Sequence, residues 1–134
     1  MTHTIIPDRV LDLLVEKVTY AHLGTLMSDG SPQVTPVWFD YRDGVLRVNT
    51  ARGRVKDRNM RRDPRVSLCI SDPVNPYRHV QIRGRVTRFT EEGAGAHIDS
   101  LAKKYLGQDK YPFAQPGEVR VIFEIEPTSC VVMG

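Results

Sequence analysis

Apolar residues near the start of the chain recur at the spacing of a helix. Those that share one helix face are Val10, Leu11, Leu14 and Val18. The pattern predicts a helix over about residues 8–19. Pro7 and Asp8 come just before this run, so we expect Asp8 to cap the helix.

From residue 21 onward the pattern changes to the alternation that is typical of half-buried strands. The strands that it predicts are residues 21–27, 33–40, 45–49, 66–71, 77–89 and 119–125, with a short last strand at residues 129–133. Polar turn sequences, SDGS at residues 28–31 and RDG at 42–44, separate the first three strands.

Two residues inside these strands restrict where in a sheet they can lie. Pro36 has no N–H to donate, so it belongs at a sheet edge, at a bulge or facing a ligand. Gly84 weakens the interior of the longest predicted strand and therefore indicates a bulge or a bend.

Two more helices are predicted among the strands. One spans residues 55–62 and ends before Asp63-Pro64, and the other spans residues 91–106 with Thr90 as its cap. Six or seven short strands joined mostly by tight turns, with three helices, predict a mainly β protein with peripheral helices in an antiparallel barrel. The length predicts a single domain over residues 1–134. No βαβ alternation is present, which argues against a Rossmann domain.

Composition narrows the class of protein. The chain is 40% hydrophobic and 26% charged, as soluble globular proteins are, and it contains no apolar run long enough for a membrane span. Its N-terminus lacks the pattern of a secretion signal. Two cysteines form neither a disulfide framework nor a zinc site. We therefore expect a reduced cytoplasmic protein without a membrane partner.

Positive charge is concentrated in one segment. Between Arg52 and Arg65 there are seven basic and two acidic residues, whereas the whole chain has a net charge of only +3. A local excess favours one anionic ligand site over a face made for nucleic acid. Aromatic residues are only 7% of the chain and do not interleave with the arginines, so nucleic-acid binding is the weakest hypothesis.

No self-contained catalytic motif is present. The chain lacks a G-x-S-x-G elbow and a Walker loop, and Cys69 has no base near it in sequence. The histidines show no metal-ligand spacing; they are His3, His22, His79 and His97. The sequence therefore identifies no catalytic residue and no metal site, and a bound cofactor is the expected source of any chemistry.

The basic segment combines the groups that a phosphate requires. The run LRVNTARGRVKDRN (residues 46–59) predicts a strand, a turn of small residues and the start of a basic helix. The helix amides, the Thr50 hydroxyl, the Arg54 guanidinium and the Lys56 ammonium would converge on an anion, and Gly53 would permit close approach. A solvated basic helix whose arginines pair with surface acids explains the spacing equally well.

Two motifs give the chain a family resemblance. They are G-T-L-x-x-D-G-x-P-Q-V-x-P-V from Gly24 and N-T-x-x-x-R-x-K-x-x-N-x-x-x-D-P-R from Asn49. With the later strand VQIRGRVTRF, they resemble the split β-barrel flavin and deazaflavin family of pyridoxamine 5′-phosphate oxidases and reductases dependent on the deazaflavin coenzyme F420. The resemblance covers roughly residues 8–126, and the second motif is most similar to the F420-dependent branch.

The resemblance implies an FMN-binding-like split barrel and specific cofactor contacts. The residues that would hold the cofactor phosphate and the start of its anionic tail are Asn49, Thr50, Ala51, Arg54 and Lys56, with Asn59 close by. Those that would line the isoalloxazine-like ring are Val34, Thr35, Pro36, Val37 and Trp38. For Trp38, a place in the core or a dimer interface is an equal alternative.

The family is homodimeric, with each cofactor in a groove between subunits. The partner chain's copies of Tyr77, Arg78 and His79 would then complete the site. The alternative, which the sequence slightly favours, is that they are ordinary surface residues at the start of a strand. The loops at residues 72–77 and 107–117 would shape the pocket for a small-molecule acceptor.

The implied function is an F420-dependent reductase that transfers a hydride between F420 and an unidentified organic acceptor. The sequence lacks the arginine and histidine motif with which true pyridoxamine-phosphate oxidases close, which argues against vitamin B6 oxidation. Arg52 and Arg58 would suit a long polyanionic tail such as oligoglutamate. The alternatives are an FMN-dependent oxidoreductase on the same barrel and a non-catalytic F420-binding carrier.

Overall fold

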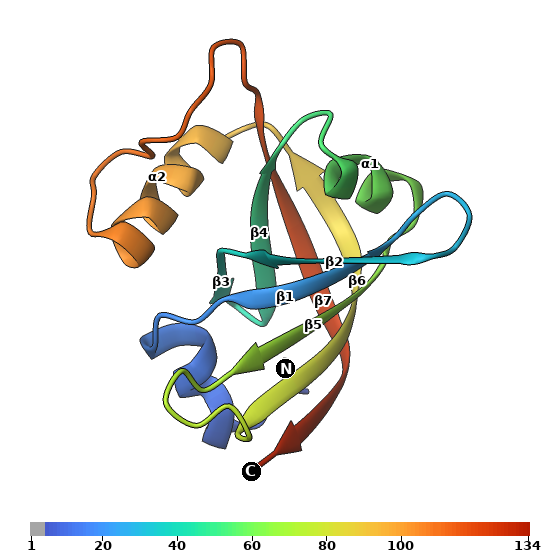
Figure 1. Ribbon diagram of the computed structural model, residues 1–134, viewed down its shortest axis with the longest axis vertical. Helices are drawn as coiled ribbons and strands as arrows, with labels where there is room; N and C mark the ends of the chain where they lie inside the picture. Colours follow the sequence, from blue (N-terminus) through green and yellow to red (C-terminus); the bar gives the residue numbers. More distant parts are fainter. Residues whose placement is uncertain (1–4) are drawn as a thin grey trace.

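Within residues 5–134, which the computed structural model describes, seven antiparallel strands form one curled sheet (Figure 1). The strands are β1 (Ala21–Leu26), β2 (Pro32–Val37), β3 (Phe39–Arg42), β4 (Val45–Ala51), β5 (Arg65–Ser71), β6 (His79–Thr90) and β7 (Arg120–Met133). They are hydrogen-bonded in the order β2-β1-β5-β6-β7-β4-β3. The predicted mainly β, antiparallel split barrel is confirmed. His3 lies outside the described residues.

The sheet curls because two consecutive strands occupy its opposite edges. Among the described residues, β2 pairs only with β1 and β3 only with β4, yet Trp38 alone separates β2 from β3 in the chain. One residue cannot span a flat sheet, so the two edges must approach each other at Trp38. The prediction of one continuous strand over residues 33–40 was therefore wrong, because the chain leaves one edge and joins the other at this point.

Pro36 and Gly84 occupy the kinds of position that the sequence predicted. Pro36 lies in edge strand β2, and the pairing of β6 with β7 shifts register between Arg83 and Gly84. A Cβ at Gly84 would come within 2.7 Å of Ile125 Cγ2, so the close approach of the strands requires glycine. Pro127 pairs opposite Gly84 at this bulge, and β7 continues through it, which corrects the prediction of two separate strands.

The helices lie at the margins of the sheet (Figure 1). The short helices η1 (Asp8–Val10) and η2 (Asp12–Glu16) replace the predicted helix over residues 8–19, and the cap position is Pro7 rather than Asp8. Helix α1 (Val55–Arg62) has the predicted bounds. Helix α2 (Ala94–Leu106) starts later than predicted, after a cap at Gly93. Thr90 instead accepts a hydrogen bond from the Glu92 amide, so its predicted capping role was wrong.

The hydrophobic core fills the inside of the curled sheet. Its largest fully buried side chains include Phe39, Leu46, Ile82, Phe123 and Ile125, which come from β3, β4, β6 and β7. Leu13 and Leu14 of η2 add to the same cluster. In the described part of the chain, no helix has both the length and the apolar character needed to cross a membrane.

Candidate functional site

A cavity of about 200 Å³ lies where the β2–β3 junction, β4, the start of α1, α2 and the loop before β7 meet. Its lining residues are Pro36, Val37, Trp38, Asn49, Thr50, Arg54, Lys56, Ile98, Tyr111, Phe113 and Arg120. The cavity thus combines the end of the edge strand with the basic turn before α1. One part of its wall is cationic and another is aromatic.

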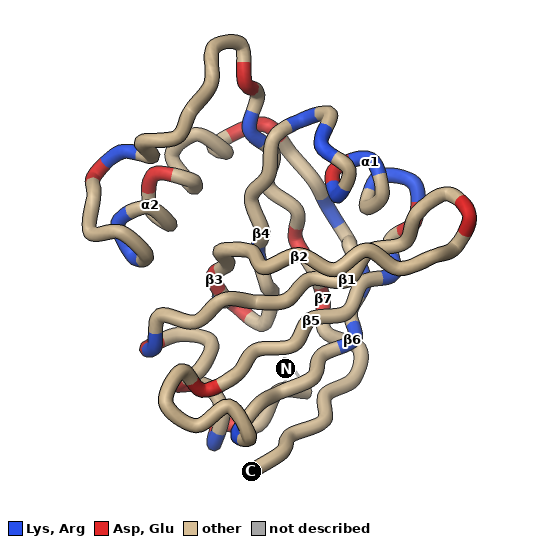
Figure 2. The backbone as a smooth tube through the Cα atoms, viewed as in Figure 1, with Lys and Arg blue, Asp and Glu red and all other residues tan. Residues whose placement is uncertain are grey.

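Arg54, Lys56 and Arg120 form the cationic wall. Basic residues gather around α1 and the turn before it (Figure 2). Burial, and then the nearby charges of Arg54 and Arg120, lower the pKa of Lys56. Within residues 5–134 neither Arg54 nor Lys56 forms an ion pair, whereas Arg120 pairs with Glu118. An anion in the cavity would relieve this repulsion.

The turn before α1 is held by a buried carboxylate. Asp57 Oδ2 accepts a hydrogen bond from the Gly53 amide at 2.8 Å, and Asp57 Oδ1 accepts one from Arg61 Nε at 2.8 Å. Gly53 has a φ of +92°, a conformation that other residues rarely adopt. Because no side chain of the described residues caps α1, its first amides are left for another acceptor.

Thr50 provides a further unsatisfied group beside this turn. The residue is 1% exposed, and its Oγ1 has no hydrogen-bond partner among the described residues. A buried hydroxyl without a partner is costly, so such groups in folded proteins call for an explanation. A ligand that contacts Thr50 would supply the missing hydrogen bond. The chemistry of the donors therefore fits an anionic group.

Trp38 lies at the centre of the aromatic wall. Its ring stacks on Tyr105 at 5.1 Å and meets Tyr111 edge-on at 6.0 Å, and Tyr111 contacts Phe113 in the same way at 5.7 Å. The Tyr105 hydroxyl donates to the Thr19 carbonyl, and burial raises its pKa to about 12. Trp38 is thus held by packing and also lines the cavity, and its contact with a cofactor ring or with a second subunit stays a prediction.

Comparison with known proteins agrees with this geometry. The family model for pyridoxamine 5′-phosphate oxidase matches residues 7–133. The chain belongs to the pyridoxamine 5′-phosphate oxidase family. A solved structure described as an F420 reductase is 34% identical to this family member, with a TM-score of 0.81 over 94% of this chain and 98% of that one. The family and this neighbour support an oxidoreductase function.

Two more distant structures share the fold. A conserved hypothetical protein from Mycobacterium tuberculosis is 24% identical, with a TM-score of 0.74 over 99% of this chain and 88% of that one. General Stress Protein 26 from Bacillus anthracis is 17% identical, with a TM-score of 0.66 over 93% and 92% of the two chains.

Several predicted site residues of this family member do not line the cavity. Val34 is exposed on the outer face of the sheet, and Thr35 is half-buried in β2. Ala51 is buried at the end of β4. Asn59 is 1% exposed and donates to Thr25 Oγ1 at 3.0 Å, so its side chain connects α1 to β1.

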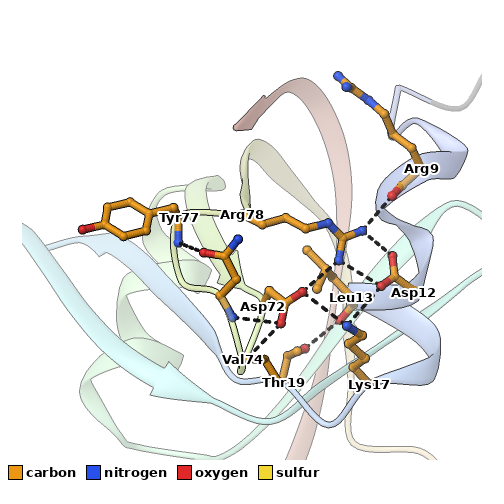
Figure 3. A network of polar contacts seen from close by, with 10 residues as sticks. Arg9, Asp12, Leu13, Lys17, Thr19, Asp72, Val74, Tyr77 and Arg78 are labelled. Atoms are coloured by element: carbon orange, nitrogen blue, oxygen red, sulfur yellow. Dashed lines mark hydrogen bonds and ion pairs between the residues drawn. The ribbon is translucent and has the colours of Figure 1, made fainter. Parts of the chain in front are cut away.

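The Arg78 side chain lies beside the N-terminal helices, and that of Tyr77 points away from them (Figure 3). His79 is the first residue of β6, which begins at the end of the sheet away from α1 (Figure 1). Arg78 donates to Asp12, to Asp72 and to the Arg9 carbonyl, which ties η1 and η2 to the β5–β6 loop. Within one chain these three residues are not part of the cavity. Their contribution to a partner's site stays a prediction.

Sequence reasoning did not single out four of the lining residues, which are Ile98, Tyr111, Phe113 and Arg120. Tyr111 and Phe113 lie in the loop that the sequence suggested for an acceptor pocket. Arg120 gave no local signal, because an arginine at the start of a strand is ordinary. The Arg120 Nε donates to Asn49 Oδ1 at 2.9 Å, and its guanidinium lies 5.0 Å from the centre of the Tyr111 ring.

Proposed function

We propose that this protein is an F420-dependent oxidoreductase that transfers a hydride between F420 and an organic acceptor. The observation that carries the proposal is the cavity itself, in which a cationic wall and a helix N-terminus face an aromatic wall. The 34% identity to a structure described as an F420 reductase supports the deazaflavin over other cofactors.

Different residues of the cavity would bind different parts of the cofactor. Arg54, Lys56 and Arg120, with the first amides of α1, would hold the phosphate and the start of an anionic tail. Pro36 and Trp38 would lie along the ring system, and the aromatic residues of the 107–117 loop would limit the access of water. Bound F420 supplies the two-electron hydride chemistry.

The side chains around the cavity indicate what the protein adds to that chemistry. The lining residues in the described chain include no carboxylate, histidine or cysteine. General acid–base catalysis by such a side chain within one subunit therefore has no support here. The protein is expected to act by positioning the two reactants and by placing positive charge near the phosphate.

The proposal is tested by titrating the purified protein with F420 and, separately, with FMN. Quenching of Trp38 reports binding, because it is the only tryptophan and lines the cavity. Tight binding of F420 with much weaker binding of FMN supports the proposal. The reverse preference would assign flavin chemistry to the same barrel. If neither ligand quenches Trp38, the basic turn is a solvated surface and the proposal fails.

A second measurement separates an enzyme from a carrier. Reduced F420 is mixed with the protein and a panel of organic acceptors, and its reoxidation is followed by absorbance. Turnover with any acceptor supports the reductase. Tight F420 binding without turnover over the whole panel would favour the non-catalytic carrier.

We also propose that the protein is a homodimer in which the outer face of the sheet packs against a second copy. Val34 is 62% exposed there and borders two hollows formed with β1 and β5. Val34→Glu is expected to lower the mass measured by light scattering to that of a monomer. Val15→Glu, at a valine that is 54% exposed on η2, is the matched control. A wild-type protein with the mass of a monomer contradicts this proposal.

A further inference from the structure

A chain of polar side chains runs from helix α2 to the cationic wall of the cavity. His97 of α2 is 5% exposed, and its Nε2 lies 3.2 Å from Asp40 Oδ2 on β3. Its Nδ1 lies 3.0 Å from Nδ2 of Asn49 on β4. Asn49 in turn accepts the hydrogen bond from Arg120 Nε. Asn49 is thus the one side chain that lies between His97 and Arg120, a cation of the proposed site.

The neighbours of Asn49 determine which way its amide points. Asn49 Nδ2 lies 2.9 Å from the Ala94 carbonyl, which can only accept a hydrogen bond. Arg120 Nε–H can only donate, so the atom of Asn49 that faces it must be the oxygen. These two contacts fix the amide without reference to His97.

The amide then determines the tautomer of His97. Both hydrogens of Asn49 Nδ2 point to acceptors, one to Ala94 and the other to His97 Nδ1. His97 Nδ1 must therefore accept, which leaves the ring hydrogen on Nε2, where it donates to Asp40. Asp40 is held in turn by two hydrogen bonds from Arg47. Asn49 has no donor left for a phosphate, so its effect on an anion would act through Arg120.

We propose that neutral His97 is a positioning residue for the cofactor site: its Nδ1 holds the Asn49 amide so that the amide oxygen fixes Arg120 at the cavity. The assignment rests on the proposed function, because it treats Arg120 as an anion-binding group. His97 does not touch the cavity, and its role passes entirely through Asn49.

Protonation of His97 would reverse this arrangement. A hydrogen on Nδ1 would face the Asn49 Nδ2 hydrogens, and turning the amide to avoid them would place Nδ2 against Arg120 Nε–H. Only a ring without a hydrogen on Nδ1 therefore keeps the Asn49 oxygen on Arg120.

Two substitutions separate this role from a general structural one. His97→Asn places an amide oxygen where Nδ1 lies, so it retains an acceptor for Asn49. His97→Gln reaches toward Asp40 and leaves Asn49 without that acceptor. Thermal unfolding is measured for both, so that only folded variants are compared.

The decisive readouts do not require a cofactor. In nitrogen-15 spectra of the ligand-free protein, the His97 ring is expected to show the tautomer with hydrogen on Nε2. The Arg120 Nε–H signal is expected to exchange with water faster in His97→Gln and at the wild-type rate in His97→Asn. A hydrogen on Nδ1 at neutral pH, or an Arg120 signal unchanged in a folded His97→Gln, overturns the proposal.

The affinity for F420 and for FMN is the second test. His97→Gln is expected to weaken binding of the ligand that the wild type prefers by roughly 3- to 10-fold, about the worth of one net hydrogen bond, and His97→Asn is expected to restore it. Equal losses in both variants contradict the proposal. If the wild type binds neither probe, the proposed function fails, and the spectra still decide the link between His97 and Arg120.

Discussion

Arg54 and Lys56 are the residues whose charge the proposed function depends on most directly. Replacing either by Gln removes one charge-assisted contact to a bound phosphate, which is expected to cost about 1.5–3 kcal/mol, or roughly 10- to 150-fold in Kd. Arg42→Gln and Lys103→Gln are the matched controls, because they remove the same charges outside the cavity. Titration followed by Trp38 fluorescence measures all four. Losses as large in the controls would point to net charge rather than to the site.

The lowered pKa of Lys56 adds a pH dependence of known sign. Burial and the neighbouring cations disfavour its charged form in the free protein, and a bound anion favours it. The contribution of Lys56 to affinity is therefore complete below this lowered pKa and is lost as the pH rises through it. Wild-type affinity should begin to fall at a pH below about 10.4, where an ordinary lysine titrates. Lys56→Gln should lack that part of the pH profile.

Two buried threonines with different partners distinguish ligand binding from folding. Thr50 Oγ1 has no hydrogen-bond partner in the described part of the chain, so Thr50→Val is expected to leave the free energy of unfolding unchanged or slightly raised while it weakens cofactor binding. Thr25 is 2% exposed and accepts a hydrogen bond from Asn59, so Thr25→Val is expected to cost about 1–3 kcal/mol of stability. Chemical denaturation and the fluorescence titration check both. A marked loss of stability in Thr50→Val would contradict the interpretation of its hydroxyl.

At the scale of single residues, the sequence predicted the cavity-lining residues that come from neighbouring segments of the chain. Pro36, Trp38, Arg54 and Lys56 all line it, and they come from two nearby segments with recognisable turn and helix signals. Arg120 was missed because only the pairing of β4 with β7, across some 70 residues of chain, brings it beside Asn49. No local pattern contains that information.

At the scale of elements, the bulge between β6 and β7 gives a direct test of packing. A methyl group at Gly84 would lie 2.7 Å from Ile125 Cγ2 and 3.0 Å from the Glu126 carbonyl oxygen. Gly84→Ala is expected to lower the free energy of unfolding by about 1–3 kcal/mol, because the strands must separate to admit it. Gly95→Ala is the matched control, since a Cβ there meets no atom of residues 5–134 within 4 Å. In helix α2 it is expected to stabilise by about 0.5–1 kcal/mol. Thermal or denaturant unfolding measures both, and a neutral Gly84→Ala would show that the bulge relaxes easily.

The element boundaries show what hydrophobic periodicity can and cannot predict. Helix α1 has its predicted bounds because Asp63-Pro64 ends it through local sterics. The caps at Asp8 and Thr90 were wrong because each helix begins at a backbone conformation that the side-chain pattern does not encode, such as the φ of +75° at Gly93. Periodicity also gave no sign that Trp38 separates two strands, because both continue the same apolar alternation.

At the scale of the whole molecule, the antiparallel barrel could be predicted because the number of short strands and tight turns leaves few alternatives. The closure of the sheet at Trp38 could not, because it depends on which strands become edges. That closure places the ring of Trp38 beside the basic turn before α1. The cavity is therefore a product of topology, and its residues acquire a shared role only when the sheet curls.

The closed arrangement also predicts how the fold responds to acid. Asp40 on edge strand β3 is bound by His97 of α2 and by Arg47 of β4. Although burial raises the pKa of this carboxyl, hydrogen bonds from His97 and Arg47 lower it to about 2. A carboxyl whose pKa is lower in the folded chain stabilises the fold above its unfolded pKa of about 3.9, and that contribution is lost as the pH falls toward 2.

With solvent screening of the partly exposed carboxylate, the contribution of Asp40 is roughly 1–2 kcal/mol. Asp40→Asn should therefore be less stable than the wild type at neutral pH, and the difference should shrink as the pH falls from about 4 to about 2. Asp109→Asn, which removes a carboxylate that is 88% exposed in its pair with Lys103, is the matched control for the loss of one charge. Denaturant unfolding at a series of pH values measures each difference. A gap between Asp40→Asn and the wild type that stays constant below pH 4 would mean that this carboxylate does not help to hold α2 and the edge strand together.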